Sequence, residues 1–148
     1  MVLRAVRVTA RTYDPRRSSG RENRWNAAGQ AVVYLSEHFS TALLEMLVHS
    51  AGVPVPSHAA WATIRGGVSV EELNVAKWPG WDDLDDQGSA RAAGSKWFSE
   101  HRSACLIVPS LPGRPFERNI VVNTTHKLAG RIVWETTVDV PWDPRLFG

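Results

Sequence analysis

Residues 31–52 read AVVYLSEHFSTALLEMLVHSAG and combine two hydrophobic patterns. The short apolar run Ala31–Leu35 is compatible with a buried strand. A helical pattern follows, starting at Ser36 or Ser40, because either serine is a suitable N-cap. It ends before Gly52, a residue type that commonly stops a helix. This segment therefore predicts a strand that leads directly into a helix.

Further short elements are expected on both sides of this segment. A second helix is predicted from Ser89 to about His101, with Ser89 as its cap. Residues 11–29 should be irregular, and residues 66–88 should form a long connection. Strands are predicted at residues 2–8, 60–65, 105–108, 120–122 and 131–139; in the last, Ile132, Trp134, Thr136 and Val138 share one face. The pattern indicates an α+β fold: a single compact domain over 1–148 with a mixed or antiparallel central sheet flanked by helices.

Composition places the chain in the globular class. Its 148 residues are 43% hydrophobic and 22% charged, values close to those of folded domains. No apolar run approaches the roughly 20 residues that a membrane-spanning helix needs. The arginines in MVLRAVRVTA interrupt the apolar core that a secretory signal requires. The single cysteine, Cys105, excludes an internal disulfide framework and a cysteine-only zinc site, so the reducing cytoplasm is the expected compartment.

Charge is distributed unevenly along the chain, although the formal net charge is only +2. The first 24 residues hold seven arginines against Asp14 and Glu22, whereas residues 71–86 are acidic. Direct nucleic-acid binding needs a wide basic face, which this low total charge does not favour. The arginine-rich start could bind a phosphate backbone or a small phosphorylated ligand, or remain solvated.

Several common catalytic and binding motifs are absent from the sequence. It contains no G-x-G-x-x-G, no G-x-x-x-x-G-K-[ST], no H-E-x-x-H and no G-x-S-x-G. Four aspartates could offer oxygens to a divalent ion, but they lack the spacing of a calcium loop, and a solvated acidic loop is favoured; they are Asp82, Asp83, Asp85 and Asp86. We therefore expect no metal.

Three polar residues stand out because apolar sequence surrounds them: Arg24, Tyr34 and Glu45. On a helix, Glu45 lies just beyond the edge of an apolar arc formed by Leu43, Leu44, Leu47 and Val48. His49 is one turn further on and can share a hydrogen bond with Glu45. The simpler interpretations are a surface arginine, a core tyrosine with a bonded hydroxyl, and a glutamate at the boundary of an amphipathic helix.

The order and spacing of these residues resemble the RES domain, the toxin family of RES–Xre toxin–antitoxin pairs. The pattern is Arg24-x9-Tyr34-x10-Glu45, within GRENRWNAAG, VVYLS and ALLEMLVH. The later segments CLIVPS, ending at Ser110, and NIVVNTTH, ending at His126, are also similar. The resemblance extends from about residue 3 to residue 135. One departure is Thr124, where the family tends to have proline.

The resemblance implies an ADP-ribosyltransferase-like fold and NAD as the substrate. RES toxins hydrolyse or phosphorolyse NAD, or transfer its ADP-ribose to a protein, and every route breaks the bond between nicotinamide and ribose. The implied function is NAD depletion and growth arrest, by an NAD glycohydrolase or NAD phosphorylase. The implied partner is a cognate Xre-like antitoxin, to which DNA binding belongs. Phosphate is the co-substrate in the phosphorolytic route.

The resemblance also assigns roles to residues of this chain. Glu45 would stabilise the positive charge that develops on the ribose, Arg24 would grip the pyrophosphate, and Tyr34 would stack on nicotinamide or hold the ribose. Ser110 would offer its hydroxyl to the nicotinamide–ribose region or to a phosphate. His49 would orient Glu45, and Ser36 would line the pocket.

The acceptor of the ADP-ribose remains open in the sequence. Water or phosphate gives NAD depletion, whereas a protein side chain makes the chain a mono-ADP-ribosyltransferase. A non-catalytic module that holds a nucleotide or a partner in the same pocket is a further alternative.

Overall fold

Eight strands form one sheet in the computed structural model, which describes residues 2–148. The strands are β1 Leu3–Ala10, β2 Val32–Ser36, β3 Ser57–Ile64, β4 Val70–Glu72, β5 Cys105–Pro109, β6 Arg118–Asn123, β7 Val133–Trp134 and β8 Val138–Asp139. Their order is β4-β5-β6-β2-β1-β3-β7, and β8 pairs with β3. The β4–β5 pair is parallel and the other pairs are antiparallel. The predicted α+β class with a mixed central sheet is therefore confirmed.

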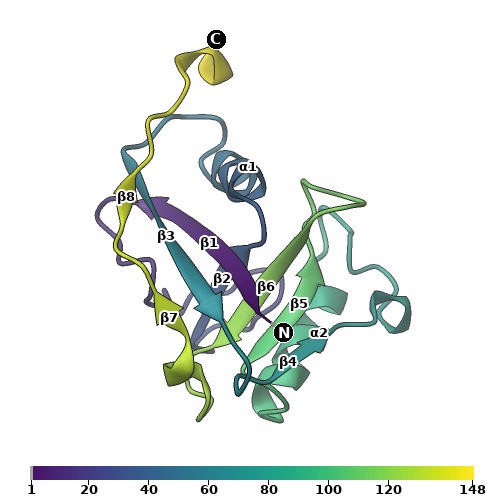
Figure 1. The fold of residues 1–148 in the computed structure, drawn as a ribbon. Coiled ribbons are helices and arrows are strands. Elements are labelled where there is room, and N and C mark those ends of the chain that lie inside the picture. Colours follow the sequence, from purple (N-terminus) through teal and green to yellow (C-terminus); the bar gives the residue numbers. More distant parts are fainter. Residues whose placement is uncertain (1) are drawn as a thin grey trace.

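Two α-helices, α1 (Phe39–His49) and α2 (Gly88–Ser99), pack against different halves of one sheet face (Figure 1). Ala42 of α1 packs against Val6 of β1 and Ala59 of β3. The buried side chains of α2 contact β2, β5 and β6 through Val32, Leu106, Val108 and Val121. Because alternate strand residues share a face, Tyr34 and Ser36 of β2 project toward this same side.

The opposite sheet face carries the largest cluster of buried apolar residues. It is built from Ala5, Val33, Leu35, Ala62, Ile64, Cys105, Ile107, Ile120 and Val122, closed by Val68 and Ile132. These side chains pack together and form a core shared by the strands. This core fixes β2, β6 and β5 side by side, which places polar residues from distant parts of the chain next to one another on the helix-bearing face.

The strand-to-helix segment is confirmed, but its predicted caps are wrong. Ser36 is the last residue of β2, Ser40 lies inside α1, and the N-cap is His38, which makes no side-chain capping bond. The chain instead enters the helix from a strand whose last residue is buried. At the other end Gly52 has a positive φ of 74°, and its N–H donates to the carbonyl of Leu47 at 3.0 Å, so the predicted stop is correct.

The other predicted elements are present, with three corrections. The 66–88 connection contains β4 and a 3-10 turn at Val75–Lys77, and two further 3-10 turns lie at Ala129–Arg131 and Pro144–Phe147. The N-cap of α2 is Gln87 rather than Ser89. The single strand predicted at 131–139 is divided into β7 and β8.

The division of the last strand has a cause in the register. Ala59 of β3 pairs with Val138, and Ala62 pairs with Trp134. Two residues of β3 therefore face three residues of the partner, Glu135–Thr137, and the extra residue interrupts the ladder as a bulge does. Because the alternation changes phase there, Ile132 is buried while Val138 is 66% exposed, so these two do not share one environment.

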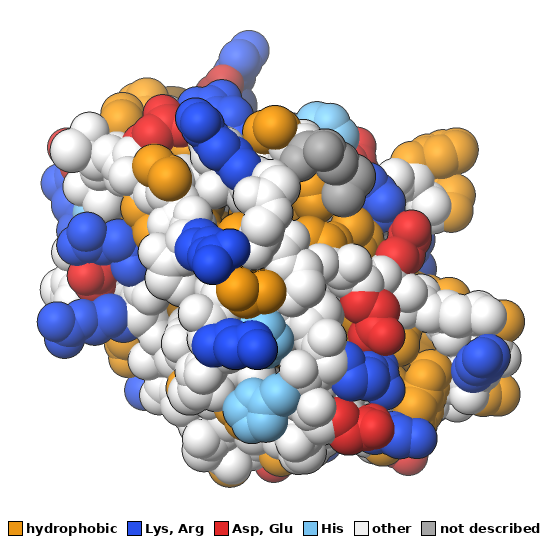
Figure 2. All heavy atoms as spheres, turned by 60° about the horizontal axis from the view of Figure 1, so that its bottom comes forward, with side chains coloured by type: hydrophobic (Ala, Val, Ile, Leu, Met, Phe, Trp, Pro, Cys, Tyr) orange, Lys and Arg blue, Asp and Glu red, His pale blue; other side chains and the backbone are white. Residues whose placement is uncertain are grey.

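The arginine-rich start is partly neutralised within the fold. Arg7 donates to the carbonyls of Pro15 and Arg17 at 2.9 and 2.8 Å, and Arg16 forms an ion pair with Asp14 at 3.0 Å. Figure 2 shows Lys and Arg side chains spread over one face, with acidic side chains among them. In the part of the chain that the structure describes, no helix is long and apolar enough to cross a membrane.

Candidate active site

The Glu45 carboxylate lies on the helix-bearing sheet face, where it accepts two hydrogen bonds on one oxygen. Ser110 Oγ and Asn119 Nδ2 both donate to Glu45 Oε1 at 2.8 Å. Ser36 Oγ donates to Asn119 Oδ1, also at 2.8 Å, which fixes the orientation of that amide. Ser36, Ser110 and Asn119 are all buried. Within residues 2–148, the other carboxylate oxygen of Glu45 accepts no hydrogen bond.

Strand pairing brings these residues together. Ser36 of β2 pairs with Asn119 of β6, Asn119 also pairs with Val108 of β5, and Ser110 directly follows β5. Glu45 reaches this row from α1, which joins the end of β2 to β3. The four residues are thus held by a rigid sheet and one helix rather than by a single loop.

The orientation of α1 differs from the one that its leucines predict. Leu44 and Val48, expected in the buried arc, are 44% and 63% exposed, while Thr41 and Ala42 are buried. Glu45 follows Thr41 by four residues and shares its face of the helix. The sheet offers hydrogen-bond donors to this face, so the glutamate turns inward and the leucine arc is displaced toward solvent.

The loop after β5 keeps Ser110 in place. Ser110 N donates to the carbonyl of Glu117 at 2.9 Å, and Gly113 N donates to Ser110 Oγ at 3.1 Å. A Cβ at Gly113 would lie 2.6 Å from Cβ of Glu117, so only glycine allows this close turn. The Ser110 hydroxyl therefore accepts a hydrogen bond from the N–H of Gly113 and donates a hydrogen bond to Glu45.

Tyr34 anchors the segment that carries Arg24. Its hydroxyl donates to Asn26 Oδ1 at 2.5 Å. Asn26 is buried, and its Nδ2 donates to the carbonyls of Arg21 and Ala27 at 2.9 Å each. Burial raises the pKa of Tyr34 well above its usual value, so the phenol stays protonated as a donor. This agrees with the interpretation of Tyr34 as a tyrosine with a bonded hydroxyl.

Arg24 is half-buried against the connection between β4 and α2. Its Nη1 donates to the carbonyls of Trp81 at 2.8 Å and Asp83 at 2.9 Å. The neighbouring Trp25 stacks on Trp81 with ring centroids 6.0 Å apart. A Cβ at Gly94 of α2 would lie 1.7 Å from the carbonyl oxygen of Trp25, so the missing side chain lets this backbone lie on the helix.

The charges around Arg24 connect it to Glu45. Burial is the main cause that lowers the pKa of the Arg24 guanidinium, and the positive charge of Arg114 lowers it further. The negative charges that oppose this shift belong to Asp82, Asp83 and Glu45. Glu45 has the smallest of these effects, so Arg24 interacts mainly with residues 81–83, and Glu45 contributes to the same mixed-charge region from further away.

The structure does not bring every predicted site residue together. Arg24, Tyr34, Ser36, Glu45 and Ser110 belong to this region, whereas His49 is exposed at the end of α1 and forms no hydrogen bond with Glu45. Ser110 and Asn119, rather than His49, make the hydrogen bonds that orient Glu45.

Sequence reasoning missed Asn119 and Asn26, which make the central hydrogen bonds of the site. Asn119 begins the run NIVV, and the signal that singled out Tyr34 and Glu45, a polar residue beside apolar neighbours, was present there too.

The acidic run serves local turns. Asp83 Oδ1 accepts from the N–H groups of Asp85 and Asp86 at 2.8 and 2.9 Å, and Asp86 Oδ1 accepts from Gly88 N at 2.8 Å. These bonds lower the pKa of Asp83. Over residues 2–148, no group of three or more His, Cys, Asp or Glu residues is placed to hold a metal ion.

Comparison with known proteins identifies the family. The family model described as "RES domain" matches residues 3–143. The chain belongs to the RES domain family. A Prs ADP-ribosylating toxin of Sphingobium sp. (strain YBL2) is 31% identical to this RES chain, over 95% of the chain and 93% of the relative. A Toxin Res of Yersinia enterocolitica is also 31% identical, over 70% of the chain and 69% of the relative. Family membership thus places the chain among the Res toxins.

Solved structures show the same fold. The crystal structure of the M. tuberculosis MbcT–MbcA toxin–antitoxin complex matches with a TM-score of 0.77 and 16% identity. The match covers 99% of this chain and 87% of that one. The RES chain therefore has the fold of a toxin of known structure across its whole length.

Proposed function

We propose that this chain is the toxin of a toxin–antitoxin pair and that it consumes NAD by breaking the bond between nicotinamide and ribose. The observation that carries the proposal is the Glu45 carboxylate. Ser110 and Asn119 hold one oxygen, and the other is left for a substrate. The charge of Glu45 acts on Arg24, although less strongly than the charges of Asp82 and Asp83. This pairing of a fixed carboxylate with a partly desolvated arginine suits a ligand that carries both a ribose and a pyrophosphate.

Glu45 has the chemical task of stabilising a cation. When the C–N bond breaks, its electron pair leaves with nicotinamide, and positive charge develops on the ribose as in glycoside cleavage. A carboxylate held in advance stabilises that charge without reorganising during the reaction. Water then forms the new C–O bond and loses a proton to solvent, giving ADP-ribose; phosphate gives ADP-ribose phosphorylated on the same carbon.

The remaining residues bind and position. In Arg24, Nη1 is held by two backbone carbonyls, and within residues 2–148 Nε and Nη2 donate no hydrogen bond, so they are free for a pyrophosphate. Tyr34 packs against the cluster beneath α2, and its hydroxyl donates to Asn26, so it positions the segment that carries Arg24. Ser110 and Ser36 act through the Glu45 network, Ser110 directly and Ser36 through Asn119.

A second candidate function is ADP-ribosyl transfer to a protein. The observation that favours it is the Sphingobium relative, which is named an ADP-ribosylating toxin and aligns with almost the whole chain. The same Glu45 site breaks the same bond in this reaction, and only the acceptor differs. A binding module without turnover would bind a nucleotide or a partner with the same residues and release no nicotinamide.

The proposed partner is a cognate antitoxin of the Xre-like type. A protein that destroys cytoplasmic NAD must be neutralised in the cell that makes it. The structural neighbour was solved as a toxin–antitoxin complex, which supports such a partner here.

The acceptor is identified by following the products. We expect purified protein to release nicotinamide from NAD, with ADP-ribose in plain buffer or phosphorylated ADP-ribose only when phosphate is present. Radiolabelled NAD in cell lysate is the parallel arm. A labelled protein band without nicotinamide release in buffer would instead establish protein transfer. Intact NAD in buffer and lysate alike would contradict both candidate reactions.

Arg24→Ala tests the pyrophosphate contact. Loss of charge-assisted hydrogen bonds worth about 1.5–3 kcal/mol should raise KM for NAD by about ten- to a hundredfold. Arg65→Ala, which removes an exposed arginine, is the matched control. An Arg24→Ala protein with the wild-type KM would show that Arg24 has no part in binding NAD.

A further inference from the structure

Two arginines from distant parts of the chain converge on residues 81–83. Arg24 holds the backbone carbonyls of Trp81 and Asp83, at 2.8 and 2.9 Å. Arg114, on the loop between β5 and β6, approaches the neighbouring Asp82, with its Nη1 3.5 Å from Oδ2. The two guanidinium groups thus reach the same short segment, one through carbonyl oxygens and the other through a carboxylate.

This arrangement brings like charges together beside the proposed site. The positive charge of Arg114 adds to burial in lowering the pKa of Arg24, because like charges repel. The Asp83 carboxylate is engaged by the N–H groups of Asp85 and Asp86. Asp82, whose side chain is 50% exposed, is left as the carboxylate that faces Arg114. Two neighbouring cations with one half-exposed carboxylate between the loops form a surface suited to a larger anion.

The ion pair between Arg114 and Asp82 is long and exposed, so another anion can replace Asp82 at low cost. Its 3.5 Å separation exceeds the about 2.7–2.9 Å of a charge-assisted hydrogen bond, and the Arg114 side chain is 41% exposed. Arg114 Nε donates to the carbonyl of Leu111 at 2.9 Å, which keeps the side chain on its loop. That loop starts at Ser110, the residue that donates to Glu45, so Arg114 follows this residue by four positions in the chain.

We propose that Arg114 is a second pyrophosphate-binding residue, which exchanges Asp82 for the phosphate oxygens of the dinucleotide when substrate enters beside Arg24. This inference rests on the proposed function and deepens it. Asp82 then acts as an internal competitor: it pairs with Arg114 in the free protein and is displaced by the doubly charged pyrophosphate. Substitutions at the two residues must therefore change NAD affinity in opposite directions.

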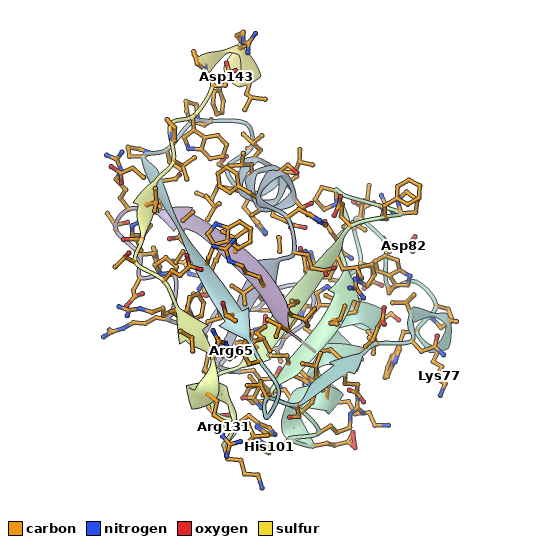
Figure 3. The ribbon with its side chains drawn as sticks, in the orientation of Figure 1. Arg65, Lys77, Asp82, His101, Arg131 and Asp143 are labelled. Atoms are coloured by element: carbon orange, nitrogen blue, oxygen red, sulfur yellow. The ribbon has the colours of Figure 1, made fainter. Side chains whose placement is uncertain are left out.

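The test is the KM of NAD for Arg114→Gln and Asp82→Asn, with Arg65→Gln as control. In Figure 3, Arg65 lies beside the end of β3, apart from Asp82 on the right of the view. Arg114→Gln should raise KM about tenfold with kcat unchanged, because the lost contact is equal in the bound and transition states. Asp82→Asn should lower KM about two- to fivefold by removing the competitor, an effect of the size expected for an exposed ion pair. Both variants should melt at the wild-type temperature.

The outcomes separate this inference from the function on which it rests. If the wild type consumes NAD and Arg114→Gln keeps the wild-type KM, the inference is overturned and the proposed function stands. A parallel loss of affinity in Arg114→Gln and Asp82→Asn would also overturn it, since that result would mean that the ion pair only shapes the loop. If the wild type neither binds nor consumes NAD, both proposals fail together.

Discussion

Glu45 depends on the residues that hold it. Asn119 donates to the same carboxylate oxygen as Ser110 and is itself oriented by Ser36. A carboxylate that must face a developing cation loses much of its effect when it can rotate away. Asn119 is therefore a positioning residue, and its contribution should be visible in kcat rather than in substrate affinity.

Asn119→Ala tests this role. Removing the amide should lower kcat by up to about a hundredfold, the loss expected from misplacing a catalytic group, while KM changes little. Steady-state kinetics with NAD measure both constants. Asn74→Ala, which removes an exposed amide that caps the 3-10 turn at Val75–Lys77, is the control. A variant with raised KM and normal kcat would place Asn119 in substrate binding instead.

The sequence identifies individual residues of the candidate site better than their contacts. Arg24, Tyr34 and Glu45 stand out as polar residues in apolar surroundings, and all three lie in the site region. Ser110 was also expected in the site, but its hydrogen bond to Glu45 and that of Asn119 were not, because these contacts join positions 65 and 74 residues from Glu45. His49 was expected beside Glu45 on local spacing alone, but the sheet offered Glu45 better donors.

The helices place the site through close backbone contacts. On α2, Gly94 meets the carbonyl of Trp25, and Trp25 is followed by Asn26, the partner of Tyr34. Any side chain at Gly94 must push the Arg24 segment away from the helix. The packing of α2 thereby sets the position of Arg24, the residue proposed to bind the pyrophosphate.

Gly94→Ala should destabilise the protein and weaken NAD binding together. The added Cβ would overlap the Trp25 carbonyl, so we expect a loss of about 1–3 kcal/mol in the free energy of unfolding, measured by urea denaturation. Gly130→Ala, where a Cβ would meet nothing within 4 Å, provides the comparison. Equal stability of the two variants would show that α2 does not constrain the Arg24 segment.

Local hydrophobic patterns predicted most helices and strands. They failed for strands whose limits depend on pairing with a neighbouring strand. The strand and helix in 31–52 follow from their hydrophobic periods. The division of 131–139 does not, because alternation continues through Glu135–Thr137 and only the register against β3 interrupts it. The three-residue strand β4 was missed because it is too short to show a period and exists through its pairing with β5.

The large apolar cluster on the sheet face opposite the helices supports the strands that carry the site. Cys105 lies fully buried in the large cluster on the far sheet face, and burial raises the pKa of its thiol to about 12. Because the thiol pKa is higher in the folded protein than in the unfolded chain, protonated Cys105 favours folding. This contribution to the free energy of unfolding is complete at any pH below the thiol pKa of the unfolded chain. That contribution is lost as the pH rises toward about 12.

Alkylation of Cys105 should therefore report global unfolding. In mildly alkaline buffer the native thiol stays protonated and inaccessible, so iodoacetamide should react only as fast as the protein unfolds. Mass spectrometry across a urea series should show labelling that follows the loss of circular dichroism. Rapid labelling without urea would contradict this and indicate that the sheet opens locally at β5.

Nicotinamide release by wild-type protein and by Glu45→Gln tests whether the Glu45 carboxylate is needed to break the nicotinamide–ribose bond. Glutamine keeps the size of the side chain and removes its charge, so the fold should persist. We expect release by the wild type and a rate lower by about a hundred- to a thousandfold in the variant. Glu100→Gln, which changes an exposed glutamate paired with Arg102, should retain full activity. Equal release by Glu45→Gln and the wild type would contradict the assignment of Glu45 as the catalytic carboxylate.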